Sequence, residues 1–159
     1  MYLTYQKYTA IYGPIDEMVF NRLCYGACKQ IDKYTTGIDG VQKLKYAFPA
    51  DGDAVESVSR CTAAVLNFLN KLLEAEKTAE SARSYAETEN GLQGKVISSI
   101  TSGNESISFT SVSQKTLVDT AVFDVSVRNK AIAEIVRDHL SGVTDANGVN
   151  LLYMGFYPM

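Results

Sequence analysis

The stretch Asp53–Leu73, with the sequence DAVESVSRCTAAVLNFLNKLL, decides how this chain folds. Its apolar residues recur at spacings of three and four, which places them on one face of an α-helix. Asp53 followed three residues later by Glu56 is typical of a capping box, so we expect the helix to begin at Asp53. The apolar face must be covered by other elements, which predicts a small helical domain organised around this helix. The residues of the face are Val55, Val58, Thr62, Val65, Leu66, Leu69, Leu72 and Leu73.

Two further long helices are expected on either side of this central one. The first is predicted from Asp16 to Tyr34, with a polar face that includes Asp32 and with Gly37 as its left-handed terminating residue. It is preceded by a short turn that Thr4 caps. The last long helix is predicted from about Gln114 to Leu140, followed by Ser141 and a terminating glycine, Gly142. Between the first and central helices, two Asp-Gly pairs and a proline indicate a connector of turns, Ile38–Asp53.

Residues 96–112 have a different pattern, which predicts a β-hairpin. They are rich in Ser, Thr, Ile and Val, and successive side chains would alternate between the two faces of a strand. The turn Gly103-Asn104 separates the two halves of this segment. A lone two-stranded hairpin is marginally stable in water, so we expect this one to pack on the helices or on another copy of the protein. Its candidate contact residues are Ile97, Ile100, Asn104, Ile107 and Phe109.

The C-terminal residues 143–159 are expected to form a docking tail. Their last part, LLYMGFYPM at residues 151–159, carries no charge. An apolar end of a chain either packs into the fold or binds a partner. We expect deletion of Leu151–Met159 to leave the helical fold intact but to abolish binding to that partner. The candidate contact residues are Leu151, Leu152, Tyr153, Met154, Phe156 and Tyr157.

The whole chain therefore predicts a mostly α protein: a small helical bundle with a β-hairpin insertion between the last two long helices. Its 159 residues suit one domain, 1–159, with the helical core at about 1–90 and 111–142. The net charge of −3 argues against a protein that grips nucleic acid through its phosphates. No apolar run is long enough to predict a transmembrane helix.

No set of residues in the sequence requires an enzyme. Cys24, Cys28, Cys61 and His139 could together form a zinc site, but free cysteines commonly fill cores, and a histidine in the last turn of a helix commonly offsets the helix dipole. Residues 145–150 have the composition of a calcium loop, yet they lack its third acidic position and closing glutamate, so we interpret them as a turn. We expect no catalytic residue, no metal and no cofactor.

The order of these parts resembles the head–tail connector (head-completion adaptor) proteins of long-tailed phages and of prophages of Gram-positive bacteria. The resemblance covers almost the full length, and its most specific pieces are QIDKYT at residues 30–35 and LLYMG at residues 151–155. A Ser-rich hairpin segment at residues 98–110 and the helix end Leu140-Ser141-Gly142 also agree. The tail here continues with Phe156-Tyr157-Pro158-Met159, which is longer than the family pattern.

The resemblance implies a structural virion protein. Such a subunit joins a head–tail connector ring that docks beneath the portal, extends the DNA channel and receives the next connector, stopper or tail component. The implied partners are the portal protein, other copies of the chain and that next component; packaged DNA passes through without specific binding, and no membrane is involved. The implied location is the virion, with the bacterial host cytoplasm during assembly. The alternative is a helical regulatory protein that binds a host or phage partner through the apolar tail.

Overall fold

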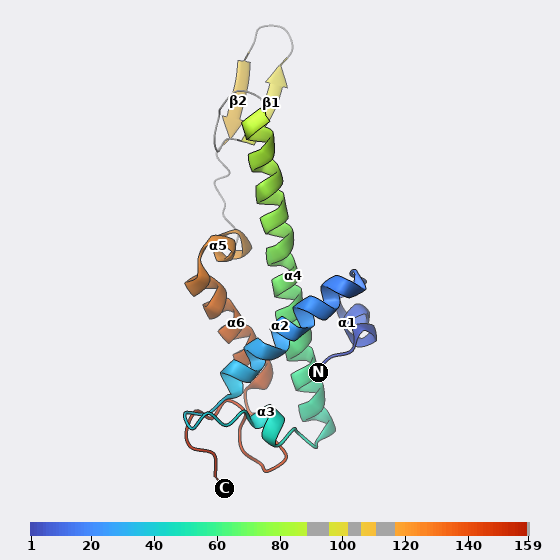
Figure 1. Cartoon of the computed structure of the whole chain (residues 1–159), viewed down its shortest axis with the longest axis vertical. Coiled ribbons are helices and arrows are strands. Elements are labelled where there is room, and N and C mark those ends of the chain that lie inside the picture. The colour runs from blue at the N-terminus through green and yellow to red at the C-terminus, as the bar shows by residue number, and fades with distance from the viewer. Residues whose placement is uncertain (89–95, 102–105, 111–116, 159) are drawn as a thin grey trace. The chain divides into compact units, whose positions relative to one another are not determined.

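A computed structural model of the chain describes residues 1–88, 96–101, 106–110 and 117–158 (Figure 1). The chain divides into two compact units. The first unit comprises Met1–Asn70 and Arg128–Met159, and the second comprises Lys71–Val127. The prediction of one domain over residues 1–159 stays a prediction.

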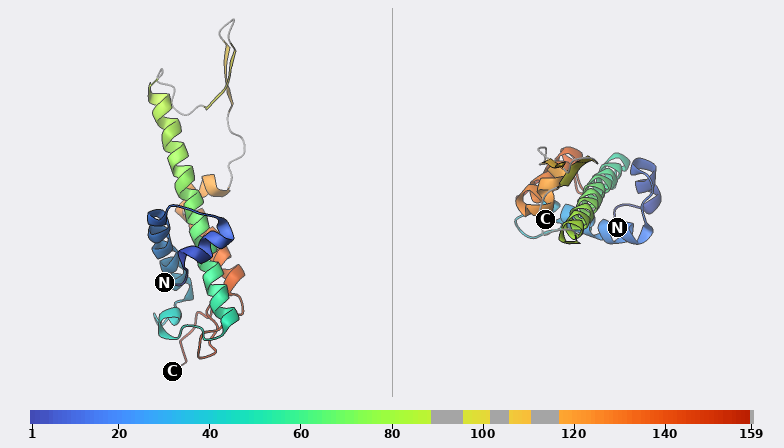
Figure 2. Two further views of the ribbon diagram at one scale, coloured as in Figure 1. Left: turned by 90° about the vertical axis from the view of Figure 1, so that its right-hand side faces the viewer. Right: turned by 90° about the horizontal axis from the view of Figure 1, so that it is seen from above.

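The first unit is helical. Its helices are α1 (Tyr5–Tyr12), α2 (Glu17–Thr35), the short α3 (Lys43–Tyr46), the first part of α4 (Gly52–Thr88) and most of α6 (Val125–Leu140). Figures 1 and 2 show α1, α2 and α6 gathered around the first part of α4. The Tyr34 hydroxyl of α2 donates to the Asn129 carbonyl of α6 over 2.9 Å, which joins the two helices that flank α4.

The predicted starts of the first two helices are confirmed. The Thr4 hydroxyl accepts the Lys7 N–H (3.3 Å), although α1 then continues to Tyr12 rather than ending after one turn. The Asp16 carboxylate accepts the Val19 N–H (3.0 Å) and caps α2. Gly142 has the left-handed φ of 78° expected of a residue that ends a helix.

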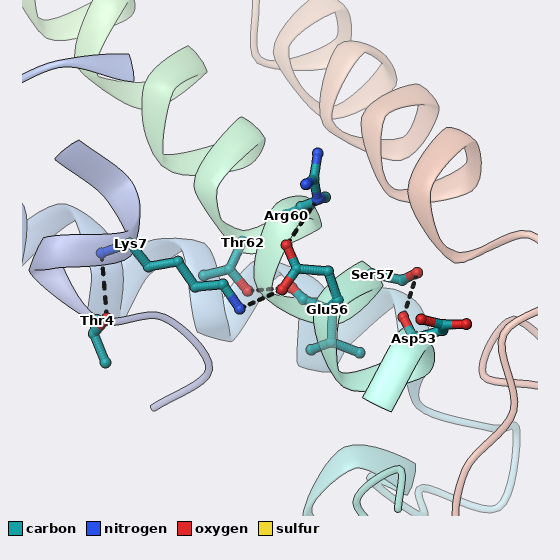
Figure 3. A network of polar contacts seen from close by, with 8 residues as sticks. Thr4, Lys7, Asp53, Glu56, Ser57, Arg60 and Thr62 are labelled. Atoms are coloured by element: carbon teal, nitrogen blue, oxygen red, sulfur yellow. Dashed lines mark hydrogen bonds and ion pairs between the residues drawn. The ribbon is translucent and has the colours of Figure 1, made fainter. Parts of the chain in front are cut away.

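The residue that caps α4 differs from the prediction. Asp51, not Asp53, accepts the orphan N–H groups of Asp53 and Ala54, each over 3.1 Å. Glu56 does not close a capping box; it pairs with Lys7 of α1 and with Arg60 one turn on (Figure 3). The carboxylate therefore serves to join α1 to α4.

The first part of α4 is the centre of the first unit. Val58, Thr62, Val65 and Leu66 are fully buried, as the apolar face predicts. Residues outside that face, Ser59, Cys61, Ala63 and Phe68, are buried as well. The helix is thus enclosed on more sides than its one-sided apolar pattern indicated.

Asp32 was predicted on the exposed face of the first long helix and is buried instead. Its carboxylate accepts the Tyr2 hydroxyl (2.6 Å) and lies 3.3 Å from the Lys45 ammonium. The N-terminal residues and the connector cover this part of α2, and neither contact follows from helical periodicity.

The last predicted helix, Gln114–Leu140, is in fact two helices. Within the described residues α5 (Leu117–Phe123) ends before Asp124, and α6 begins at Val125. The Asp124 carboxylate accepts the N–H groups of Ser126 (2.8 Å) and Val127 (3.3 Å), so Asp124 caps α6. A side chain that offers such a cap competes with helix continuation, which explains the break.

The predicted fold class, a helical bundle with a β-hairpin insertion, is wrong. The chain is mostly helical, and no strand is inserted in the bundle among the described residues of the first unit. The strands β1 (Val96–Thr101) and β2 (Ser106–Thr110) belong to the second unit, where they pair with one another as a two-stranded antiparallel sheet. The period-two pattern of side chains along a strand specifies how the strand pairs, but not which part of the protein it belongs to. The pattern therefore gave no basis for placing the hairpin in the bundle.

The observed cap of α4, Asp51, and the predicted one, Asp53, make a testable pair. We expect Asp51→Ala to lower the free energy of unfolding by about 1 kcal/mol, because two N–H groups lose their acceptor. Asp53→Ala is the matched control, since it removes only a charge near the helix start, worth about 0.3 kcal/mol and less in salt. Urea unfolding in 0.5 M salt measures both; an equal loss in the two variants, or a larger loss for Asp53→Ala, contradicts the assignment of the cap to Asp51.

Candidate docking surface

The C-terminal tail is anchored to the first unit by a buried lysine. Lys43, at the start of α3, is fully buried. Its ammonium donates to the main-chain carbonyls of Thr35 (3.1 Å), Leu151 (3.2 Å) and Tyr153. An ammonium has three N–H donors, so these three carbonyls satisfy it completely. The end of α2, the connector and the tail are therefore fixed at one point.

Burial lowers the pKa of Lys43, because it disfavours the charged form. The negative charges of Asp39 and Asp145 act in the opposite direction and favour the ammonium. A buried charge without compensating partners is strongly unfavourable, so the carbonyls and these carboxylates are what allow a lysine at this position.

A second anchor lies in the turn at residues 145–150, which the sequence predicted. Asp145 is buried, and one of its carboxylate oxygens accepts the N–H groups of Asn147 and Val149, both over 2.9 Å. The other oxygen accepts the Tyr157 hydroxyl (2.6 Å). The turn thus holds the end of the tail through the tyrosine.

A third anchor joins the connector to the tail through the Asp39 carboxylate and a main-chain hydrogen bond. The Asp39 carboxylate accepts the N–H groups of Tyr157 (2.6 Å) and Val41 (3.0 Å), and the Ile38 N–H donates to the Met154 carbonyl (3.1 Å). The hydrogen bond from the Tyr157 N–H lowers the pKa of Asp39 most, and the hydrogen bond from the Val41 N–H lowers it further.

Gly37 is required for this approach rather than for a left-handed conformation, which corrects its predicted role. Its φ is not positive, and α2 is capped by Thr36. A Cβ on Gly37 would lie 2.8 Å from the Gly155 carbonyl oxygen and 2.8 Å from an Asp39 carboxylate oxygen. The glycine therefore allows the tail to pass against the connector.

The predicted contact residues of the tail divide into anchors and exposed groups. Leu151 and Tyr157 are buried and Leu152 is half-buried, so these residues hold the tail in place. Tyr153, Met154 and Phe156 are exposed, Phe156 to 75%. Two connector side chains are exposed as well: Ile38, whose backbone N–H donates to the Met154 carbonyl, and Tyr46, whose ring centroid lies 5.2 Å from that of the buried Tyr157. We call Ile38, Tyr46, Tyr153, Met154 and Phe156 the connector–tail surface.

The hairpin candidates lie in the second unit. Among the Cα partners of the two strands, Ile97 faces Phe109 and Ile100 faces Ile107. Asn104 lies outside the described residues. The proposal of a contact role for these five residues stays a prediction.

The alternative zinc site finds no support in the described part of the chain, where no group of three or more His, Cys, Asp or Glu side chains could hold a metal ion. Cys24 and Cys61 are buried, and Cys28 and His139 are half-buried. Among the described residues, no helix has the length and apolar character needed to cross a membrane.

Comparison of the chain with protein-family models, with curated proteins and with solved structures gives no match.

Sequence reasoning missed Lys43, Asp39 and the exposed Ile38 and Tyr46 as parts of this surface. The Asp-Gly pair at residues 39–40 was a turn signal, but nothing local distinguishes Lys43 from Lys45 two residues later. The two lysines differ because the tail supplies carbonyl acceptors to Lys43 and none to Lys45 among the described contacts. The contact of Lys43 with Leu151 joins residues 108 positions apart in the sequence.

The tail anchor predicts a large difference between these two lysines. We expect Lys43→Met to lower the free energy of unfolding by about 3 kcal/mol, because it leaves buried carbonyls without a donor. Lys45→Met is the control: its side chain is 60% exposed and its pair with Asp32 should contribute less than about 1 kcal/mol. Urea unfolding followed by circular dichroism measures both, and equal small losses would contradict the role of Lys43.

The Asp39 anchor predicts a pH dependence of the tail. Because the folded pKa of Asp39 is lowered, its contribution to stability is present above the ordinary aspartate pKa and is lost as the pH falls through the folded value. We expect the NMR signal of the Tyr157 N–H to titrate with an inflection below 3.8, the ordinary value. Asp39→Asn should abolish the inflection; an unchanged titration in that variant would show that another group causes it.

Proposed function

We propose that the chain is a structural assembly subunit that docks on a partner protein through the connector–tail surface. The observation that supports this most is the division of the tail into buried anchors and exposed apolar groups. Isolated exposed apolar residues are common, but a group of large ones held on anchored backbone is typical of interfaces. Tyrosine, phenylalanine and methionine are enriched in such interfaces.

The anchoring also favours binding energetically. Ordering a flexible chain end on binding costs free energy, and a tail already fixed by Lys43, Asp39 and Asp145 has paid most of that cost during folding. The surface contains no charged side chain, although Lys45 and Asp39 lie close to it in sequence. A partner of apolar character with a polar rim would suit it best.

Together with the resemblance in residue layout, this surface leads us to propose a subunit of a phage head–tail connector ring. In this proposal the connector–tail surface docks on the portal protein, and further copies complete the ring through contacts between unlike patches. The next connector, stopper or tail component binds the completed ring, and packaged DNA passes through without specific binding. The proposed location is the virion, after assembly in the host cytoplasm.

The second candidate is a helical regulatory protein that uses the same surface to bind a host or phage partner. It is favoured by the same exposed residues, and it differs in the partner and in the number of copies bound. A regulator should form a complex of fixed small stoichiometry, whereas a connector subunit should form a multi-copy assembly.

Point substitutions test the surface better than removal of the tail. Deleting Leu151–Met159 was expected to leave the fold intact, but it would remove two of the three carbonyls around Lys43 and the buried Leu151. Met154→Ser with Phe156→Ser should leave the unfolding free energy within about 0.5 kcal/mol, because both side chains are exposed. Met18→Ser on α2, where the side chain is 82% exposed, is the matched control.

The experiment is size-exclusion chromatography with light scattering, on the chain alone and mixed with the portal protein encoded by the same phage or prophage. We expect the wild type and Met18→Ser to elute with the portal as a multi-copy complex, and the double variant to elute separately. Equal binding by the double variant would contradict the docking surface. No association of the wild type would contradict the connector function, and co-purification of a host protein at fixed stoichiometry would favour the regulator.

A further inference from the structure

Exposed cations lie in a row along α2, on the side away from its buried residues. Arg22, Lys29 and Lys33 are all exposed, and Tyr25 between them is 65% exposed. The four residues follow one another at spacings of three and four, so they lie within about 80° of one another around the helix. Ala27, which is fully buried, lies on the opposite side. We call Arg22, Tyr25, Lys29 and Lys33 the α2 stripe.

Tyrosine rings, and no carboxylate of the described residues, pair with the lysines of the α2 stripe. The Lys29 ammonium lies 4.7 Å from the centroid of the Tyr25 ring. The Lys33 ammonium lies 5.6 Å from the centroid of the Tyr34 ring. The face of an aromatic ring attracts a cation, which holds both ammonium groups close to the helix. A row of such cations favours a partner of negative charge.

The same chain carries a matching set of carboxylates on α4. In the sequence of this helix, Gly52–Thr88, glutamates stand at positions 76, 80 and 87. Spacings of four and seven place these positions within about 40° of one another around the helix. The set spans eleven positions, about 16 Å along the axis, and so does the stretch from Arg22 to Lys33. We call Glu76, Glu80 and Glu87 the α4 glutamates.

The two sets match in one antiparallel register. The cations recur after seven and then four residues along α2, and the glutamates recur after seven and then four residues when α4 is followed backwards. The pairs are Arg22 with Glu87, Lys29 with Glu80, and Lys33 with Glu76. Arg83 then falls opposite Gly26 rather than opposite a cation. Met18 falls opposite position 91, beyond the end of α4, and therefore lies outside the contact.

We propose that the α2 stripe of one copy binds the α4 glutamates of a neighbouring copy as an antiparallel pair of helices. This inference rests on the proposed function, because it names the two unlike patches through which copies form the ring. Each copy offers one patch to the copy before it and the other to the copy after it, as a ring requires. Exposed ion pairs are individually weak, so the contact gains strength where the portal holds many copies together.

Nucleic acid is the competing occupant of the α2 stripe, because cations beside a tyrosine also suit a phosphate backbone. Two observations favour a second copy. The register of the cations along α2 matches that of the α4 glutamates, and the chain as a whole has a net charge of −3, which opposes binding to phosphates.

Zero-length cross-linking with a carbodiimide tests the contact on the full chain without the portal, so its outcome does not depend on portal docking. The reagent joins lysine amines to carboxylates that are in contact. An equal mixture of ¹⁴N-labelled and ¹⁵N-labelled chains distinguishes bonds between copies from bonds within one copy. At millimolar protein concentration and low salt, we expect a Lys33–Glu76 bond between copies, which we call the reporter cross-link. Salt at about 0.5 M should reduce its yield severalfold, because it screens exposed charges.

Charge reversal tests the register. Arg22→Glu with Lys29→Glu reverses the α2 stripe, and Glu80→Lys with Glu87→Lys reverses the α4 glutamates. Each double variant alone should lose the reporter cross-link, because like charges then face one another. An equal mixture of the two double variants should restore it between unlike copies, since each reversed helix then meets its complement.

Lys130→Glu with Arg137→Glu is the matched control, because it reverses two exposed cations of α6 at the same spacing of seven. This control should keep the reporter cross-link, and circular dichroism verifies that every variant is folded. The proposal would be overturned by the absence of the reporter cross-link between wild-type copies, by an equal loss in the control, or by a mixture that does not restore it. Duplex DNA binding that only the α2 double variant loses, without the reporter cross-link, would assign the stripe to nucleic acid and overturn the proposal as well.

Discussion

The structure of the first unit depends on the charge of Lys43 being buried and satisfied. A buried ammonium must find three acceptors, and here all three are main-chain carbonyls that no side-chain substitution elsewhere removes. One carbonyl ends α2 and two belong to the tail, so satisfying the charge fixes the path of the chain at both places. Asp39 and Asp145 then hold the rest of the tail by its N–H group and its tyrosine hydroxyl.

This arrangement turns an apolar chain end into a defined surface. Leu151 and Tyr157 point into the unit, and the residues between them carry Tyr153, Met154 and Phe156 outward. The connector meets the same segment through the Ile38 N–H, which donates to the Met154 carbonyl, and through the Tyr46 ring, which packs on Tyr157. Stability and binding therefore use different residues of one segment, which makes it possible to change the surface without unfolding the unit.

Local features of the fold followed from the sequence because their causes are local. The caps Thr4 and Asp16, the terminating Gly142 and the buried face of α4 each depend on residues within a few positions of one another. The start of α4 was predicted wrongly: the spacing of Asp53 and Glu56 indicated a cap at Asp53, but Asp51, two residues earlier, accepts the free N–H groups. The break at Asp124 is similar, because one capping carboxylate interrupts an otherwise helical pattern.

The candidate site was foreseen only in part because its contacts are distant in sequence. An uncharged tail suggested a contact surface, but its pattern could not tell the anchors Leu151 and Tyr157 from the exposed Phe156. Asp32, which the sequence assigns to solvent, and Lys43, which the sequence did not single out, are both buried by partners from other segments. The fold class, a helical bundle with a hairpin insertion, was wrong because a strand pattern specifies a strand and not the unit of the chain to which it belongs.

Amide hydrogen exchange of the tail, compared with that of the first part of α4, is the most direct test of this account. If the tail is a fixed part of the first unit, the N–H groups of Leu151, Tyr153 and Tyr157, which donate to Val143, Asn150 and Asp39, should be strongly protected. Exchange of these amides at the rate of a free chain, while α4 stays protected, would show that the tail is not anchored and would contradict the account.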